Sequence, residues 1–265
     1  NYEGSRYSTE FWNTARAYED TVERVALRAM LPPKGKTLIE IGAGYGRLAD
    51  LYTGYETVVL MDYAQTQLDQ AVARLGPGDP QSGPRYVYVE AATVIEAIAE
   101  VLAPAGAFVL EFANKRNVKA IARYLVGRQA WSPFSPAPVE FVELNFDFHP
   151  RWIWQQLAAN GLQREVVRTV SHFRIGLLKR LIPTKVLAAL DTLVQPTGAL
   201  WQLSPSVFVR SRAGSARQAA PAGQFFRCPA CGDPLGAPPQ AVFHCSCGET
   251  WRKHGEIYDF RYPRD

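Results

Sequence analysis

The sequence predicts an α/β protein in which a doubly wound, mostly parallel sheet is followed by a small C-terminal metal-binding module. Three observations lead to this fold class. An apolar segment that ends at Ile41 runs into a glycine-rich turn and a helical pattern, as a buried parallel strand and its following helix do. A second apolar segment ends in an acid, Asp62. All four cysteines lie between residues 228 and 247, which points to a local metal site rather than a disulfide framework.

Length and composition set the broad class. A chain of 265 residues and 29.5 kDa suits one large domain and one small one, and 47% hydrophobic with 20% charged residues is ordinary for a globular protein. No apolar run has the length of a membrane span and no signal-peptide pattern opens the chain, so we expect a soluble, cytoplasmic protein. The net charge of +4 is modest, and no dense basic run singles out a nucleic-acid-binding face.

The sequence predicts alternating helices and strands in the N-terminal third of the chain. An amphipathic helix over residues 8–31 ends at Pro32 and Pro33, and the glycines and prolines of residues 76–84 predict an exposed loop. Apolar runs and helical spacing predict, in order, a strand at 37–41, a helix at 47–53, a strand at 57–62, a helix at 65–75, a strand at 86–89 and a helix at 93–102.

The remainder of the large domain is less regular. A helix from Pro150 to Asn160 should be capped by Gly161. The amphipathic segment 175–194, interrupted at Pro183, has three interpretations: a lid over a hydrophobic substrate, a membrane-surface helix pair, or a helix packed on the sheet. The other predicted elements are a strand at 107–112, a basic helix at 113–130, a loop at 131–138, an alternating segment at 139–149 and strands at 166–170 and 206–210.

The glycine turn is the candidate ligand site. Without a Cβ, Gly42, Gly44 and Gly46 let the backbone approach a ligand closely. Glu40 lies inside the preceding strand, where a carboxylate is unfavourable without a partner or a ligand. Asp62, twenty residues after Gly42, is placed to accept hydrogen bonds from ribose hydroxyls. A carboxylate this close would repel the phosphate of a dinucleotide but suits a cationic or amine-bearing ligand.

The stretch from Glu40 to Gly46 resembles the first motif of class I S-adenosylmethionine-dependent methyltransferases, Glu-x-Gly-x-Gly-x-Gly. The resemblance implies a Rossmann-like sheet, S-adenosylmethionine as cofactor and a ribose contact by Asp62. It also implies that residues 113–200 include an insertion on the substrate side, and that the helix at 8–31 covers the cofactor unless it serves only core packing. The implied cofactor-binding residues are Glu40, Gly42, Ala43, Gly44, Gly46, Asp62 and Tyr63.

The pattern breaks between Ala92 and Thr93. In the methyltransferases that the chain resembles, a central strand and an adenine-contacting acid stand at this point. The loss of that strand would leave a slot in the core that protein interiors do not tolerate. We therefore expect that about thirty residues, one strand with its connections, are absent from the sequence near 92/93; the alternative is a protein that departs from the fold.

The cysteines predict a zinc site with two open ligand sets. Two knuckles, one at Cys228–Cys231 and one at residues 244–247, suit a tetrahedral Zn²⁺. The first set is Cys228, Cys231, Cys245 and Cys247; the second replaces Cys245 by His244. We favour the all-cysteine set because thiolate is the softer ligand.

The chain is thus divided into a methyltransferase-like domain at 1–210, a linker rich in Ala, Gly, Pro and Arg at 211–224, and a zinc ribbon at 225–265. Residues 225–262 resemble zinc ribbons that accompany some methyltransferases acting on translation components. That resemblance implies an RNA or protein contact through the ribbon.

Methyl transfer requires the acceptor and the sulfonium in line, and positioning supplies much of the acceleration. Asp147, His149 and Glu111 are weak candidates for a base; a helix cap is the competing interpretation of His149 and a surface acid that of Asp147. The apolar, aromatic region 131–200 favours a small or lipid-like acceptor. An RNA or protein acceptor and a non-catalytic scaffold are the alternatives.

Overall fold

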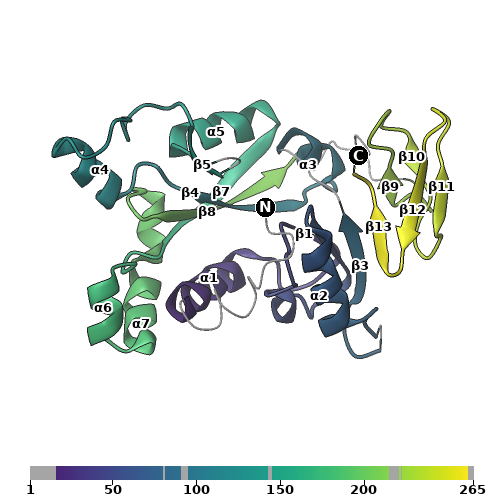
Figure 1. The fold of residues 1–265 in the computed structure, drawn as a ribbon, viewed down its shortest axis with the longest axis horizontal. Helices are drawn as coiled ribbons and strands as arrows, with labels where there is room; N and C mark the ends of the chain where they lie inside the picture. Colours follow the sequence, from purple (N-terminus) through teal and green to yellow (C-terminus); the bar gives the residue numbers. More distant parts are fainter. Residues whose placement is uncertain are drawn as a thin grey trace. The chain divides into compact units, whose positions relative to one another are not determined.

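The computed structural model describes residues 16–79, 81–90, 95–142, 145–214, 221 and 223–261. The chain forms two compact units that do not follow chain order. Unit 1 consists of Asn1–Glu10, Pro32–Val94 and Ala219–Asp265, and unit 2 of Phe11–Leu31 and Ile95–Gln218. The elements of both units are labelled in Figure 1.

Unit 1 begins with a parallel βαβ arrangement. Its elements are β1 (Gly35–Ile41), the 3-10 helix η2 (Ala49–Leu51), β2 (Tyr55–Asp62), α2 (Gln65–Leu75) and β3 (Arg85–Glu90). β1 pairs with β2 and β2 with β3, both parallel, so that Ile41 lies opposite Met61 and Asp62 opposite Glu90. The predicted α/β class with parallel strands is confirmed. β1 differs from the expected buried strand, because it is the edge of its sheet and leaves Ile39 and Ile41 each 42% exposed.

The C-terminal module extends the same sheet. It contains β9 (Phe226–Arg227), β10 (Pro234–Leu235), β11 (Val242–His244), β12 (Thr250–His254) and β13 (Ile257–Asp259). β13 pairs parallel with β3, giving the strand order β1-β2-β3-β13-β12-β11. One buried cluster joins apolar side chains of β2 and β3 to those of the module: Val59, Val87, Val89, Cys228, Leu235, Phe243, Trp251, Tyr258 and Phe260. The module therefore covers an edge that β3 would otherwise present to other chains.

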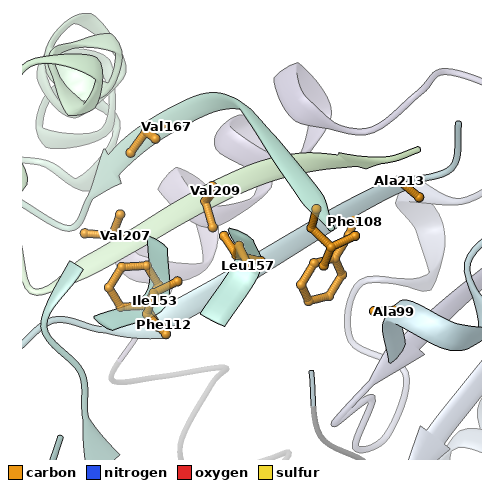
Figure 2. Packing of buried hydrophobic residues seen from close by; sticks show 10 residues of the cluster. Ala99, Phe108, Phe112, Ile153, Leu157, Val167, Val207, Val209 and Ala213 are labelled. Atoms are coloured by element: carbon orange, nitrogen blue, oxygen red, sulfur yellow. The ribbon is translucent and has the colours of Figure 1, made fainter. Parts of the chain in front are cut away.

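Unit 2 is built on the antiparallel sheet β4-β8-β7. One face of the sheet carries α5, whose Ile153 and Leu157 lie against Phe112 and Val209 (Figure 2). The elements are α1 (Ala17–Met30), α3 (Ile95–Val101), β4 (Ala107–Ala113), α4 (Val118–Leu125), β5 (Val139–Val142), β6 (Asn145–Asp147), α5 (Pro150–Ala159), β7 (Leu162–Val170), α6 (Gly176–Leu181), α7 (Thr184–Val194), the 3-10 helix η3 (Gln195–Ala199) and β8 (Ser206–Ala213).

Several predicted elements differ from the observed ones. The basic helix expected over 113–130 is only α4, because Asn117 caps its start by accepting a hydrogen bond from the Ala120 amide at 2.9 Å and Gly127 follows its end with φ +70°. The alternating segment 139–149 is the hairpin β5–β6. The expected linker at 211–224 begins later, since residues 211–213 belong to β8.

The suspected gap near Ala92 and Thr93 falls outside the described residues. Before it, the described strands β1, β2 and β3 belong to the six-stranded sheet, and the first strand after it, β4, belongs to a separate three-stranded sheet. β1 ends one sheet and β4 ends the other, and no described strand pairs with the second edge of β1.

Candidate functional site

The glycine turn follows β1 and is tied to the end of β2. Gly42, Gly44 and Gly46 have φ of +72°, +53° and +73°, a left-handed backbone that favours glycine. The amides of Gly42 and Ala43 donate to the Met61 carbonyl at 2.9 and 3.0 Å. A Cβ on Gly42 would meet no atom within 4 Å, whereas a Cβ on Gly46 would lie 2.8 Å from Leu75 Cδ1. The first glycine thus faces open space, and the third lets α2 approach the turn.

Asp62 ends β2 with its carboxylate fixed on the turn. Its Oδ2 accepts from the Gly44 amide at 2.7 Å and its Oδ1 from the Ala64 amide at 2.9 Å. A carboxylate has about four acceptor positions, so about two remain for a ligand. The next residue, Tyr63, is 61% exposed.

Gln67 also lies beside the turn, although its place in the sequence did not single it out. It is 2% exposed, and neither its amide oxygen nor its amide nitrogen has a hydrogen-bond partner among the described residues. Its Oε1 lies 3.7 Å from where a Cβ of Gly44 would stand. A buried amide without partners costs about 1–3 kcal/mol, so such a group under a glycine turn indicates a site for a polar ligand or water.

Two further acids stand near the carboxyl ends of the strands. Glu40 is half-buried in β1, opposite Leu60. Glu90, at the end of β3, is buried, and Arg261 Nη1 lies 2.9 Å from its Oε1. Arg261 follows β13, so the ribbon supplies the cation that pairs with this acid. That pair could not be predicted from the sequence, because the pairing of β13 with β3 was not predicted.

The residues around the turn fit an uncharged or amine-bearing nucleoside better than a phosphate. Ligands of parallel α/β sheets bind at the carboxyl ends of the strands, where this chain places the turn, Asp62 and Glu90. Carboxylates accept hydrogen bonds from hydroxyl and ammonium groups but repel phosphate. The open side of Gly42 and the unpaired amide of Gln67 leave room and polar atoms for such a ligand.

The four cysteines converge in the ribbon. Their sulfur atoms all lie within 4.8 Å of one another, with 3.4 Å between Cys231 and Cys245 and 3.8 Å between Cys228 and Cys247. Gly232 and Gly248, with φ of +79° and +94°, close the two knuckles.

His244 is not part of the cysteine group. It lies in β11 with its Nδ1 3.2 Å from the Thr250 hydroxyl. Trp251 donates its indole N–H to Cys228 Sγ at 3.3 Å, a contact that holds the buried thiol in place. Of the two predicted ligand sets, the structure brings together the all-cysteine one.

The three base candidates belong to unit 2. His149 caps α5 by accepting from the Arg151 amide at 3.1 Å, and burial, aided by Arg116 and Lys115, lowers its pKa to about 4. Burial raises the pKa of Asp147, the last residue of β6. Glu111 accepts from the Ser206 hydroxyl at 2.5 Å. The glycine turn belongs to unit 1, and a catalytic role for any of the three stays a prediction.

Comparisons with known proteins extend to structures alone. No protein-family model and no curated protein sequence matches the chain. Among solved structures, it is similar to an S-adenosylmethionine-dependent methyltransferase from Mesorhizobium loti, with 18% identity over 72% of this chain and 97% of that one and a TM-score of 0.43. It is also similar to magnesium protoporphyrin IX methyltransferase from Synechocystis with bound S-adenosylhomocysteine, with 13% identity, 75% and 84% coverage and a TM-score of 0.44.

A third similar structure is a complex between the Haloferax volcanii Trm112 methyltransferase activator and a protein assigned as a methyltransferase. The identity is 13%, the coverage 75% of this chain and 91% of that one, and the TM-score 0.47. These likenesses concern the fold alone. The features that meet in unit 1 are a glycine turn that is open at Gly42, a carboxylate held by two backbone amides and a buried amide without partners among the described residues.

Proposed function

We propose that this protein is an S-adenosylmethionine-dependent methyltransferase that binds its cofactor at the carboxyl ends of β1 and β2. The observation that carries the proposal is Asp62, whose carboxylate is fixed by the Gly44 and Ala64 amides beside the open glycine turn. When bound, S-adenosylmethionine supplies an electrophilic methyl group on a sulfonium. The chain's own part is to hold and orient that molecule, which is a major source of rate in such transfers.

Each predicted cofactor residue has a role that its surroundings support. Asp62 keeps acceptor positions for the ribose hydroxyls. Glu40 is half-buried one strand away and suits the cofactor's ammonium group. The backbone at Gly42, Ala43 and Gly44 lets the ligand approach closely, since no Cβ blocks Gly42. Gly46 serves the packing of α2, and exposed Tyr63 offers an aromatic ring.

Gln67 extends this set. Its buried amide oxygen and nitrogen lie under Gly44 without partners among the described residues. We include it as a group that makes hydrogen bonds to the bound cofactor or to a water beneath it, because an unpaired buried amide is otherwise destabilising.

We also propose that Cys228, Cys231, Cys245 and Cys247 hold a structural Zn²⁺. Four sulfur atoms within 4.8 Å of one another suit the tetrahedral thiolate site that zinc prefers. The ribbon supports the sheet through β13 and supplies Arg261 to Glu90. The second role that we propose for the ribbon is contact with an RNA or a protein through its outer face.

The acceptor is a small or lipid-like molecule in our proposal. Unit 2, which includes the predicted substrate-side region, exposes many apolar side chains, among them Leu125, Phe134 and Leu177. An RNA or protein acceptor remains the alternative. A non-catalytic scaffold is favoured by one observation, the open edge of β1 among the described strands.

Calorimetry with S-adenosylhomocysteine tests the cofactor proposal. In Gly42→Ala the new methyl group enters the open space of the turn, and we expect a loss of affinity of ten-fold or more, about 1.4 kcal/mol. Gly255→Ala is the matched control, because Gly255 also has a positive φ (+57°) and open surroundings but lies between β12 and β13. It should bind like the parent. If the parent chain itself shows no affinity for S-adenosylhomocysteine, the non-catalytic scaffold is the correct hypothesis.

A further inference from the structure

The segment from Ile175 to Trp201 in unit 2 carries an apolar surface that the fold does not bury. α6 buries none of its side chains, and α7 buries only Leu187, Ala188 and Asp191. On the outer side of α7, Val186, Leu190 and Leu193 repeat at helical spacing and are exposed. The packed-helix interpretation of this segment therefore explains only one side of α7.

The exposure of these side chains is large for isolated surface residues. Leu181, Leu193 and Leu200 are 72%, 76% and 78% exposed, and Trp201 is 56% exposed. Several large exposed apolar side chains in one segment of a folded protein indicate an interaction site. The exposed apolar residues of the segment are Ile175, Leu177, Leu181, Val186, Leu190, Leu193, Leu200 and Trp201.

The exposed charges of the same segment are all positive. Its cations are Lys179, Arg180 and Lys185. Lys179 is paired with buried Glu19 at 3.0 Å, whereas Arg180 and Lys185 are exposed. The one acid between residues 172 and 201 is Asp191, which is fully buried. The surface is therefore both apolar and cationic.

A second helical region of unit 2 also exposes both apolar and cationic side chains. α4 exposes Val118 and Leu125 together with Lys119 and Arg123, and the sequence contains no acid between residues 112 and 139. The start of α4 is tied to the chain just after the first segment, since the Val118 amide donates to the Leu203 carbonyl at 3.0 Å. Both helical regions lie at one end of unit 2, drawn in teal and green in Figure 1.

We infer that α4 and the segment 175–201 together form a surface that docks unit 2 on an anionic lipid bilayer. Exposed leucines and a tryptophan enter the headgroup boundary, while lysine and arginine side chains reach the anionic headgroups. Each such cation contributes to attraction by anionic lipid. No helix among the described residues is long and apolar enough to cross a membrane, so the contact is with the surface of the bilayer.

Charge complementarity selects the lipid over a second copy of the chain. A symmetric dimer would place the same patch on both partners, and the cations of one copy would then face those of the other. An anionic bilayer offers the opposite charge across the whole surface. The inference does not depend on methyl transfer, which is tested separately by cofactor binding.

Sedimentation with vesicles of phosphatidylcholine alone or with phosphatidylglycerol tests the inference on the full chain. We expect binding to the anionic vesicles that falls as salt rises, and little binding to the neutral ones. Reversing two exposed cations, in Arg180→Glu with Lys185→Glu, should weaken binding by about thirty-fold or more, since each Lys or Arg near the surface contributes about 1 kcal/mol. The control Arg252→Glu reverses an exposed cation of the ribbon and should leave binding unchanged.

Separate variants test the contribution of the apolar side chains to vesicle binding. Leu193→Ser with Leu200→Ser should also lose vesicle binding, whereas Val101→Ser, at an exposed position at the end of α3, should not. All three leucine and valine changes are at exposed positions, so the melting temperature should stay near that of the parent. The blue shift of tryptophan fluorescence on vesicle binding should diminish in Trp201→Phe.

Three outcomes would overturn the inference. They are no sedimentation with anionic vesicles, equal binding to neutral and anionic vesicles, and a concentration-dependent dimer that the leucine variants abolish. The last result would assign the surface to a second copy of the chain.

Discussion

Removal of the proposed zinc from the ribbon should abolish binding of the proposed cofactor, although no cysteine belongs to the glycine turn. The ribbon and the first half of the sheet share one buried cluster, and β13 hydrogen-bonds to the edge of β3. β3 in turn pairs with β2, whose last residue is Asp62. Loss of the ribbon's fold would therefore expose Val87 and Val89 and leave the strand beside Asp62 with an open edge.

The size of the expected stability loss follows from the free energy that a zinc ion contributes to the folding of a small domain. Small zinc domains gain about 10–16 kcal/mol from their ion, and whole domains are stable by about 5–15 kcal/mol. Chelation therefore removes a free energy as large as the stability of unit 1 itself. We expect the metal-free chain to lose the cooperative thermal transition of unit 1 and its affinity for S-adenosylhomocysteine together.

The assay combines metal analysis, calorimetry and hydrogen exchange on one preparation. After chelation, amides of β3 and β13 should exchange rapidly, and added zinc should restore protection and binding. Cys228→Ser should resemble the chelated chain, because Cys228 is the buried ligand, 1% exposed, that also accepts from Trp251. His244→Ala is the matched control and should retain zinc, since His244 lies outside the cysteine group.

A metal-free chain that keeps its thermal transition and its affinity for S-adenosylhomocysteine would refute this reasoning. The ribbon would then be an appendage to a sheet that is stable without it. Loss of zinc in His244→Ala would instead move the fourth ligand to the histidine.

Three further predictions concern buried polar groups. Arg261→Ala leaves the carboxylate of Glu90 buried without its cation, and should lower the free energy of unfolding of unit 1 by about 2 kcal/mol in a denaturant titration. Tyr18→Phe removes a 2.6 Å hydrogen bond to fully buried Asp191 and should cost about 2–3 kcal/mol at pH 7. Burial alone would raise the pKa of Asp191, but hydrogen bonds from His172 and Tyr18 lower it. The stability loss in Tyr18→Phe should therefore shrink as the pH falls through the folded pKa of Asp191 and the carboxylate becomes protonated. A loss that is the same at all pH values would contradict a hydrogen bond to a charged Asp191. His149 is kept neutral by its lowered pKa of about 4, so stability should fall as the pH drops from about 6.5 toward that value, and His149→Asn, which keeps a capping side chain, should remove most of this dependence in melts across pH.

Periodicity and turn chemistry were sufficient for most local elements. α2 spans residues 65–75 as predicted, and α5 begins at Pro150 and is followed by Gly161 with φ +67°. These signals are local, because a proline or a glycine acts on the backbone of its own neighbourhood. The same holds for the predicted turn after Ile41, whose three glycines all adopt a left-handed backbone.

Features that depend on long-range strand pairing could not be predicted from the sequence. The parallel pairing of β13 with β3 joins strands far apart in the chain, and nothing in Ile257–Asp259 marks its partner. The pair of Arg261 with Glu90 follows from that pairing alone. Gln67 was missed because a polar residue on an amphipathic helix is expected at the surface, whereas it is buried beside the turn.

Binding of S-adenosylhomocysteine to the parent chain and to Asp62→Ala tests the central claim most directly. Loss of hydrogen bonds to a charged acceptor is worth about 1.5–3 kcal/mol, and we expect the dissociation constant to rise about ten-fold to a hundred-fold. Asp69→Ala, which removes an exposed acid of α2, should bind like the parent. Equal affinity of Asp62→Ala and the parent, or no binding by the zinc-loaded parent, would contradict a cofactor site at this turn.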